Sequence, residues 1–396
     1  MPTRRQFVTL FAPLLATCAG HPGVSNASGQ PSSAAASKTT PPSANACSWP
    51  AWIAFRDKFI QADGRVIDFL ANSHSTSEGQ VYGLFFALVA NDRSSFERIL
   101  DWARANLAGG DLTARLMAWQ WGKKSDGSWG VLDANAASDA DLWLSYILYQ
   151  AGHIWQDAKL RASAELLQAR IEKELIINVP GLGPVLLPGP QGFALKSGGW
   201  KLNPSYLPFQ VLAGLQHEVP RGPWKALAQN TMRMLDAVTP QMLVADWVAW
   251  RPQQGFVLDK EVGVNGSYDA IRTYLWAGML SRHDPWRSKL LGRMKGMLTL
   301  VEKNAVPPHK LDASNGNLSD GAGPLGFSAA LLPFLAANDA SAALEKQKLR
   351  ITAGGGVPQI YYEQALALFA LGFIEQRFHF ARNGKLMIPK QANCQT

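Results

Sequence analysis

The chain has 396 residues, enough to bury a single large core. Apolar residues make up 47% of it and charged residues only 17%, which excludes intrinsic disorder for most of its length. The formal net charge of +8 is modest and forms no basic and aromatic strip, so no nucleic-acid partner is expected. The chain also carries 14 tryptophans, an unusually large number that bears on ligand binding below.

Residues 1–19 have the layout of a signal peptide. The pair Arg4 and Arg5 precedes a short apolar stretch, an arrangement typical of twin-arginine export. This stretch is too short to span a bilayer, and no later segment offers about 18 uninterrupted apolar residues. We therefore expect an exported protein, periplasmic or extracellular. The leader is expected to be cleaved after Ala19, or alternatively to yield a lipoprotein anchored through Cys18, because the four residues ending there approximate a lipoprotein box.

The segment 20–46 is rich in Ser, Ala and Pro, so we expect a flexible, disordered linker followed by a catalytic domain at 47–396. Outside the leader, the remaining cysteines are Cys47 and Cys394, one at each end of this domain. In an oxidising compartment such a pair predicts a disulfide, the alternative being two free thiols. The 7 histidines show no metal-binding spacing, so neither a metal nor a cofactor is expected.

Two kinds of helical segment alternate along this domain. One kind is apolar nearly all round and must be covered on every side. The other carries an apolar stripe opposite a charged face. Alternation of six buried and six half-exposed helices predicts an all-α fold, an (α/α)6 barrel of six inner and six outer helices. The inner segments are 77–90, 139–151, 204–215, 267–280, 324–336 and 358–374, and the outer ones are 49–60, 93–107, 158–175, 224–238, 286–303 and 341–349.

The connections between the helical hairpins are long and rich in Gly and Pro. Turn signals around 184–187 predict a small β-hairpin excursion within 179–203. Long loops gathered at one end of a barrel are where a binding cleft is built.

Three acids stand at the starts of buried segments: Glu78, Asp139 and Asp269. Ser77 and Ser138 are natural N-caps for the first two. Because all inner helices of such a barrel run the same way, the three acids are expected to border one end of it. The alternative for each acid is a plain helix-start carboxylate that interacts with the helix dipole.

Two acids across a cleft lined by aromatic side chains suit glycoside hydrolysis, in which one carboxyl protonates the leaving oxygen and the other activates water. Glu78, crowded by Asp139, is the candidate acid. Arg272 is a candidate partner for the acids, with a purely structural salt bridge to Asp269 or Asp141 as the alternative. The alternative for each aromatic residue is packing in the core or in a loop. The predicted substrate-binding residues are Trp121, Trp129, Asp141, Tyr206, Trp247, Tyr268 and Arg272.

Three runs of sequence resemble motifs of glycoside hydrolase family 8. TSEGQVYG at 76–83 is similar to the segment that bears the family's acid, ASDAD at 137–141 to its signature, and SYDAIR at 267–272 to the segment of its proposed base. The likeness extends through CSWPAW at 47–52, WGKK at 121–124, NPSYLP at 203–208 and GFSAA at 326–330. It therefore covers essentially the whole chain after the linker.

The resemblance implies an inverting endo-β-1,4-glucanase, a monomer that acts on cellulose and cello-oligosaccharides. Glu78 would be the proton donor, Asp269 the base and Asp139 a residue that binds and distorts the sugar. The chain looks like the periplasmic family members encoded with bacterial cellulose synthase, which makes the cellulose synthase complex a candidate partner. The alternatives are a xylanase or chitosanase of the same family, or a non-catalytic glycan-binding component of a secretion complex.

Overall fold

The computed structural model describes residues 49–357 and 359–389, all of which belong to the unit Asn45–Thr396. The predicted signal peptide, the linker at 20–46, lipidation at Cys18 and the Cys47–Cys394 disulfide lie outside these residues.

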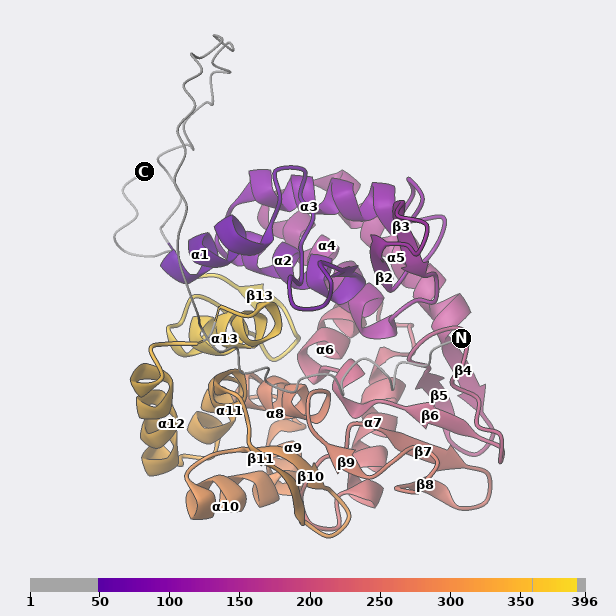
Figure 1. Cartoon of the computed structure of the whole chain (residues 1–396). Helices are drawn as coiled ribbons and strands as arrows, with labels where there is room; N and C mark the ends of the chain where they lie inside the picture. The colour runs from indigo at the N-terminus through magenta and orange to yellow at the C-terminus, as the bar shows by residue number, and fades with distance from the viewer. Residues whose placement is uncertain (1–48, 358, 390–396) are drawn as a thin grey trace. The chain divides into compact units, whose positions relative to one another are not determined.

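Six helices of the described chain form a closed inner ring (Figure 1). Successive members contact one another in the order α2, α4, α6, α8, α11 and α13, and α13 returns to contact α2. Each inner helix lies within the segment predicted to be buried, apart from ends that extend by a few residues. The inner helices are α2 (Ser77–Val89), α4 (Ser138–Ile154), α6 (Phe209–Glu218), α8 (Ala270–Gly278), α11 (Leu325–Ala337) and α13 (Tyr361–Ile374).

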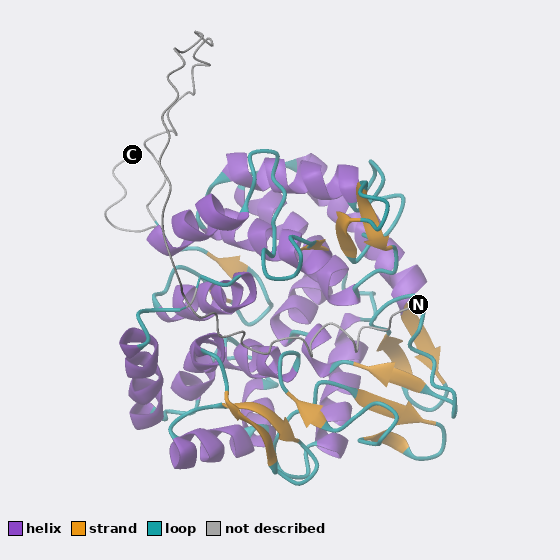
Figure 2. Ribbon diagram, in the orientation of Figure 1, coloured by secondary structure: helices purple, strands orange, loops and turns teal. Residues whose placement is uncertain are grey.

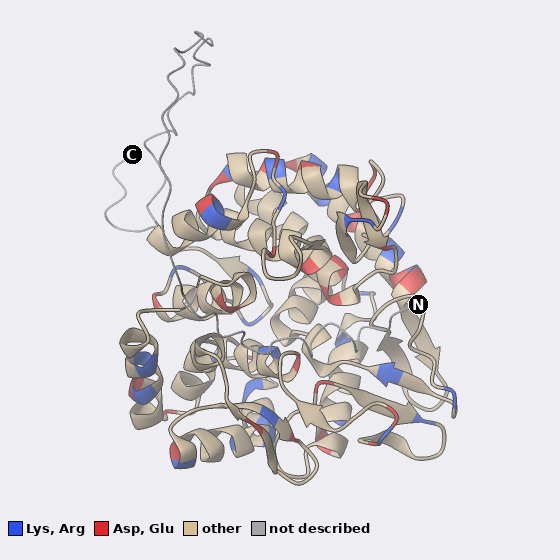
Figure 3. Cartoon of the chain, in the orientation of Figure 1, with Lys and Arg blue, Asp and Glu red and all other residues tan. Residues whose placement is uncertain are grey.

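An outer layer packs against this ring. Helices α3, α5, α7, α9 and α12 each contact the inner helix that precedes them, and α1 contacts both α2 and α13. Charged side chains concentrate on outer helices such as α3 and α12, whereas inner helix α11 has none (Figure 3). The predicted (α/α)6 barrel is therefore confirmed. The outer helices are α1 (Pro50–Phe59), α3 (Arg93–Asn106), α5 (Ala158–Leu175), α7 (Trp224–Val238), α9 (Arg287–Arg293), α10 (Lys295–Asn304) and α12 (Ser341–Ala353).

One outer helix is broken where the sequence predicts continuity. The segment 286–303 forms α9 and α10, which are separated at the buried Met294. The break brings Gly296 against a neighbouring loop, where its N–H donates to Met242 O at 3.0 Å. A Cβ at position 296 would lie 2.3 Å from the Gln241 carbonyl oxygen, so this close approach requires glycine.

The third inner helix begins later than predicted. Pro204–Tyr206 form a short 3-10 turn, η2, and α6 starts only after Pro208. The residue before a proline is driven out of the helical region, and Leu207 accordingly has φ −120° and ψ 65°. The turn places Ser205 and Tyr206 beside α8.

Short antiparallel strands decorate the loops (Figure 2). A hairpin is present, formed by β4 (Ile176–Val179) and β5 (Gly183–Leu186), but β4 begins before the predicted range 179–203, and residues 184–186, where turn signals were expected, are strand. The other small sheets were not predicted. Three strands, β1 (Ser75–Thr76), β2 (Gln120–Lys123) and β3 (Trp129–Asp133), lead into α2 and α4. The remaining strands are β6 (Trp200–Leu202), β7 (Val248–Arg251), β8 (Gly255–Val257), β9 (Asn265–Gly266), β10 (Pro308–Asp312), β11 (Leu318–Ala322), β12 (His379–Phe380) and β13 (Leu386–Met387).

Aromatic side chains from four inner helices fill the middle of the ring. The Phe369 ring of α13 lies 4.9 Å from that of Phe85 in α2 and 5.1 Å from that of Trp276 in α8, and Trp143 of α4 contacts both Phe85 and Trp276. All four side chains are buried. The barrel is therefore packed, not hollow. No helix in the described ranges combines the length and the apolar character needed to cross a bilayer.

Candidate active site

Glu78 lies in the first turn of α2. The Thr76 hydroxyl accepts a hydrogen bond from Gly79 N–H at 3.1 Å, so the N-cap is Thr76 and not Ser77 as predicted. The Ser77 hydroxyl is thereby free to donate to Glu78 Oε2, at 3.0 Å. Glu78 keeps partial solvent exposure, as a carboxyl that must reach a ligand requires.

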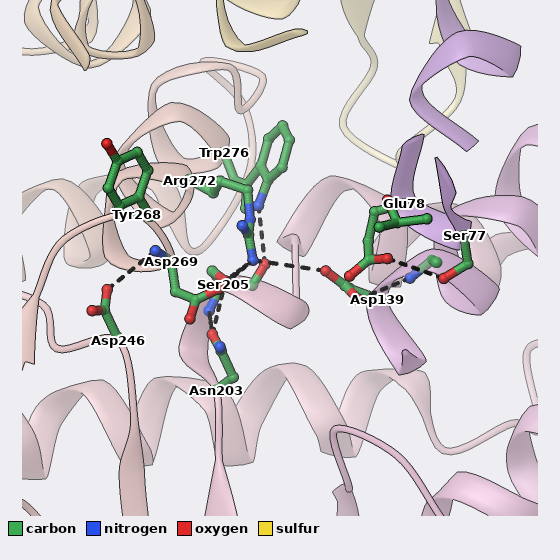
Figure 4. A network of polar contacts seen from close by, with 12 residues as sticks. Ser77, Glu78, Asp139, Asn203, Ser205, Asp246, Tyr268, Asp269, Arg272 and Trp276 are labelled. Atoms are coloured by element: carbon green, nitrogen blue, oxygen red, sulfur yellow. Dashed lines mark hydrogen bonds and ion pairs between the residues drawn. The ribbon is translucent and has the colours of Figure 1, made fainter. Parts of the chain in front are cut away.

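Asp139 lies in the first turn of α4. The N-cap is Ala137, which makes no side-chain cap, so the prediction of Ser138 as N-cap is wrong. Asp139 Oδ1 accepts a hydrogen bond from Ala140 N–H at 3.0 Å, and Oδ2 lies 3.7 Å from Arg272 Nη2. In Figure 4 the carboxyl groups of Glu78 and Asp139 point toward each other.

Asp269 is the N-cap residue of α8, but its carboxylate does not cap that helix. Its Oδ1 instead accepts a hydrogen bond from Arg272 Nη2 at 2.8 Å, one turn further along the chain. The side chain is 26% exposed, so solvent reaches it.

Arg272 connects the acids of α4 and α8. Figure 4 shows its guanidinium with Glu78 and Asp139 on one side and Asp269 on the other. Nη1 donates to Tyr362 Oη at 3.1 Å, and Nη2 also donates to Ser205 Oγ at 2.9 Å. Burial works against the charged guanidinium, but the surrounding tyrosines and carboxylates outweigh it and raise the pKa of Arg272 well above its ordinary value. Arg272 is therefore a fixed cation that bridges two of the three predicted acids.

The short turn η2 orients this arginine. Asn203 Oδ1 accepts hydrogen bonds from Ser205 N–H at 3.0 Å and Ser205 Oγ at 2.8 Å. Trp276 Nε1 donates to Ser205 O at 3.0 Å, which ties the turn to α8. Tyr206 follows with its ring centroid 5.9 Å from the Arg272 guanidinium, although only 4% of this residue is exposed.

Asp141 does not fit its predicted role in substrate binding. It is completely buried, with 0% exposure, and its Oδ1 accepts a hydrogen bond from Met117 N–H at 3.2 Å. Burial, reinforced by the nearby Asp139 and Glu78 carboxylates, raises the pKa of Asp141 well above its ordinary value. Because this carboxyl is enclosed on all sides and is held by the Met117 N–H group, we propose a structural role for Asp141 in place of the predicted contact with substrate. Arg272 accordingly pairs with Asp269 and Asp139, not with Asp141.

Two of the predicted aromatic residues form a platform on β2 and β3. The rings of Trp121 and Trp129 lie 5.3 Å apart at an angle of 21°. The Arg65 guanidinium lies 4.4 Å from the Trp121 ring centroid and 4.8 Å from that of Trp129. Trp129 is nevertheless 48% exposed, so much of its indole is open to a ligand. The platform is linked to the helix that bears Glu78, because β2 pairs with β1 and β1 ends just before α2.

Two further predicted residues lie in loops next to other elements. Trp247 comes just before β7, and Tyr268 comes just before α8. The Trp247 ring is partly buried and carries the Lys201 ammonium 3.9 Å from its centroid. The Tyr268 hydroxyl lies 3.2 Å from His309 Nε2, and His309 Nδ1 lies 2.8 Å from Asp320 Oδ2. Tyr268 is thus held by the β10–β11 hairpin.

Comparison with known proteins gives the family. The sequence matches Glycosyl hydrolases family 8 over residues 38–376, which is most of the chain. The chain belongs to this family. It is 46% identical over 344 residues to an endoglucanase of Xanthomonas axonopodis pv. citri (strain 306), covering 86% of this chain and 88% of the relative. It is 44% identical over 344 residues to an endoglucanase of Escherichia coli (strain K12), covering 86% of this chain and 91% of the relative.

A solved structure shares the fold. The crystal structure of endo-1,4-D-glucanase from Vibrio fischeri ES114 superposes with a TM-score of 0.80 at 39% sequence identity, covering 86% of this chain and 99% of that one.

Several residues that shape the site of this family 8 hydrolase escaped the sequence analysis. Asp246 accepts hydrogen bonds from the backbone that leads into α8, and Tyr362 donates to the Tyr268 carbonyl oxygen at 2.6 Å. Burial raises the pKa of Tyr362 to about 12, so this hydroxyl stays protonated. No sequence motif indicated that Tyr362 or Arg65 belongs to the site. Asp246 had one available signal, an acid within the apolar run 243–249.

Proposed function

We propose that this protein is an endo-β-1,4-glucanase that hydrolyses internal bonds of cellulose with inversion at the anomeric carbon. The observation that carries the proposal is the placement of Glu78, Asp139 and Asp269 at the starts of three inner helices, with Arg272 between them (Figure 4). Family membership supports the reaction class, and the endoglucanases at 44–46% identity support the substrate.

In this proposal Glu78 protonates the leaving oxygen while Asp269 takes a proton from the attacking water. An inverting enzyme needs room for that water, so the two carboxyl groups are expected about 6.5–9.5 Å apart. Asp139, facing Glu78, binds the sugar at the point of cleavage and favours its distorted ring. The Ser77 hydroxyl orients Glu78 through its contact with Oε2.

Arg272 and its partners fix the orientation of the side chains in this site. The guanidinium holds Asp269 in one orientation and is itself held by Tyr362 and Ser205. A preorganised site does not have to reorient these groups during the reaction, which is a principal source of catalytic power. Trp129 and Trp121 would provide a stacking surface for glucose units further along the chain, since a pyranose ring can lie flat on an indole.

The test compares the full-length protein with Glu78→Gln on carboxymethylcellulose. We expect the wild type to release reducing ends and the variant to lose this activity while its thermal unfolding is unchanged. Glu97→Gln is the matched control, because Glu97 lies on the exposed face of α3 and pairs only with Arg93 among the ion pairs of the described chain. Full activity in Glu78→Gln would remove its assignment as the acid.

Proton NMR of the first anomer released from a cello-oligosaccharide reports substrate, bond and stereochemistry together. Release of the α-anomer supports inversion, and release of the β-anomer contradicts it. Parallel assays on xylan and chitosan identify the two alternative substrates within the family. Binding of cello-oligosaccharides without any cleavage would favour a non-catalytic glycan-binding component of a secretion complex.

We further propose that the protein is exported and trims glucan emerging from a cellulose synthase complex. The paired arginines and the short apolar stretch in residues 1–19 support export. Cell fractionation of the wild type and of the double variant Arg4→Lys, Arg5→Lys tests it, and the variant should accumulate unprocessed in the cytoplasm. Mass spectrometry of the mature protein distinguishes cleavage after Ala19 from lipidation at Cys18.

A further inference from the structure

Asp246 makes an unusual set of contacts with the start of α8. It lies between α7 and β7, outside any helix or strand. Its Oδ1 accepts hydrogen bonds from three backbone N–H groups: Ser267 at 2.8 Å, Asp269 at 3.2 Å and Ala270 at 2.7 Å. Figure 4 shows the Asp246 carboxylate against the backbone of the Asp269 segment.

These contacts hold the backbone at the start of α8, where Asp269 makes no cap of its own. The first N–H groups of a helix have no partner within the helix, and an aspartate at the N-cap position normally accepts from them with its own side chain. Asp269 occupies that position in α8 and makes no such bond. Its carboxylate is instead directed to Arg272. The N–H groups that such a cap would bind, those of Ile271 and Arg272, donate instead to Ser267 O at 3.0 Å and to Asp269 O at 3.1 Å. Asp246 accepts from the preceding N–H groups, so no N–H group of the helix start depends on the Asp269 carboxylate.

The same segment is fixed from other directions. Ser267 Oγ donates to His309 O at 2.7 Å, and Tyr362 Oη donates to Tyr268 O at 2.6 Å. The Asp246 backbone N–H donates to Asn265 O at 2.7 Å, so Asp246 is itself tied to the strand that leads into the segment. Of these residues, Asp246 is the one that binds the backbone N–H of Asp269 itself.

We propose that Asp246 is the positioning residue of the catalytic base: from a distant segment it holds the backbone of Asp269 at the start of α8, so that the Asp269 carboxylate can face the attacking water. This inference rests on the proposed function, in which Asp269 is the base. The proximity of the two carboxyl groups has an electrostatic consequence, since burial and the Asp269 charge together raise the pKa of Asp246 to about 7. The N–H groups of Ala270 and Ser267 and the charge of Arg272 act in the opposite direction and favour the ionised form.

The test compares Asp246→Ala with Asp246→Asn in the full-length enzyme. Alanine removes the acceptor, whereas the asparagine amide oxygen can still accept from the same N–H groups. We expect kcat on a cello-oligosaccharide to fall about 100-fold in Asp246→Ala, the loss expected when a catalytic group is misplaced by about 1 Å. KM should change by less than about threefold, and Asp246→Asn should recover most of the lost kcat, because the mechanism depends on the acceptor. Wild-type kcat in the alanine variant, or equal loss in both variants, would overturn the proposal.

Asp284→Ala is the matched control. Asp284 is buried and likewise accepts from a backbone N–H, that of Trp286 at 2.8 Å, but it lies beyond the C-terminal end of α8. We expect this variant to lose thermal stability without the 100-fold loss of kcat. A loss of kcat equal to that of Asp246→Ala would show a general effect of destabilisation and would refute a positioning role.

Hydrogen exchange separates this inference from the proposed function. The amides of Ser267, Asp269 and Ala270 should exchange faster in folded Asp246→Ala than in the wild type, with or without activity on glucan. Unchanged exchange at these amides refutes the contact made by Asp246. If exchange at these amides changes but the wild type cleaves no glucan, the contact made by Asp246 is supported. In that case the proposed function fails, together with the role of Asp269 as base.

Discussion

Arg272 donates a hydrogen bond to Asp269 from one turn further along the same helix, with 2.8 Å between Nη2 and Oδ1. The same nitrogen reaches Ser205 Oγ and lies 3.7 Å from Asp139 Oδ2. A lysine keeps the charge but cannot reproduce this planar set of contacts. Loss of one charge-assisted hydrogen bond, about 1.5–3 kcal/mol, predicts that Arg272→Lys lowers kcat about 10- to 100-fold. Steady-state kinetics on a soluble cello-oligosaccharide measure this.

Arg251→Lys controls for the general effect of this substitution. Arg251 is also a buried arginine with two acidic partners, Asp259 and Glu261, but it contacts none of the three predicted catalytic acids. We expect it to keep near-wild-type kcat. Equal loss of kcat in both variants would mean that Arg272 acts through stability alone.

The exposed indole of Trp129 predicts a dependence on substrate length. If a glucose unit stacks on it with the energy of an aromatic pair, about 0.5–1.5 kcal/mol, Trp129→Ala should raise KM for long cello-oligosaccharides about two- to tenfold. Oligosaccharides too short to reach the platform of Trp121 and Trp129 should be unaffected. Leu166→Ala removes another exposed apolar side chain, on outer helix α5. It should change KM neither for long nor for short cello-oligosaccharides. An equal effect at every chain length would contradict an outlying stacking surface.

The barrel was predictable because the sequence of its inner helices leaves few other solutions. A segment such as 324–336, which is apolar nearly all round, must be covered on all sides, and six such segments alternating with amphipathic ones require two layers. Two outer helices were predicted to the residue, α5 at Ala158–Leu175 and α7 at Trp224–Val238. Periodicity is a local property, and these helices obey it.

What escaped prediction depends on contacts between distant segments. The break between α9 and α10 exists because the Gly296 backbone meets Met242, and Asp246 holds the start of a helix to which it does not belong. The different directions of Asp139 and Asp141, by contrast, follow from helix geometry. Residues two apart in a helix point about 200° away from each other, so Asp139 and Asp141 cannot both face one ligand.

The aromatic packing in the middle of the barrel predicts a large loss of stability for Phe369→Ala. This ring lies within 5.1 Å of the rings of Phe85, Phe86 and Trp276, and it is buried. Removing a buried phenylalanine leaves a cavity and costs about 3–5 kcal/mol. Urea unfolding measures the free energy of unfolding directly. The control Phe69→Ala removes a ring that is half exposed and should cost clearly less, so similar losses in the two variants would contradict the central role of Phe369.

The buried carboxyl of Asp141 predicts that its replacement stabilises the protein increasingly as pH rises. In the unfolded chain an aspartate ionises near pH 3.9, whereas burial raises the pKa of Asp141 in the folded state. Below about pH 3.9 both states hold the proton and no stability is lost. Above it the unfolded state releases the proton first, so the free energy of unfolding of the wild type falls as pH rises toward the folded-state pKa.

Asp141→Asn has no proton to release at this position, and its amide oxygen can still accept from Met117 N–H. The variant's free energy of unfolding, relative to the wild type, should therefore increase between pH 4.5 and 7 by at most about 1.4 kcal/mol per pH unit. Urea unfolding at several pH values measures this slope, and the exposed Glu97→Gln should show almost none. Asp141→Asn should also keep its affinity for cello-oligosaccharides, because the buried carboxyl cannot touch them. A flat difference in stability together with lost affinity would restore Asp141 to the substrate-binding residues.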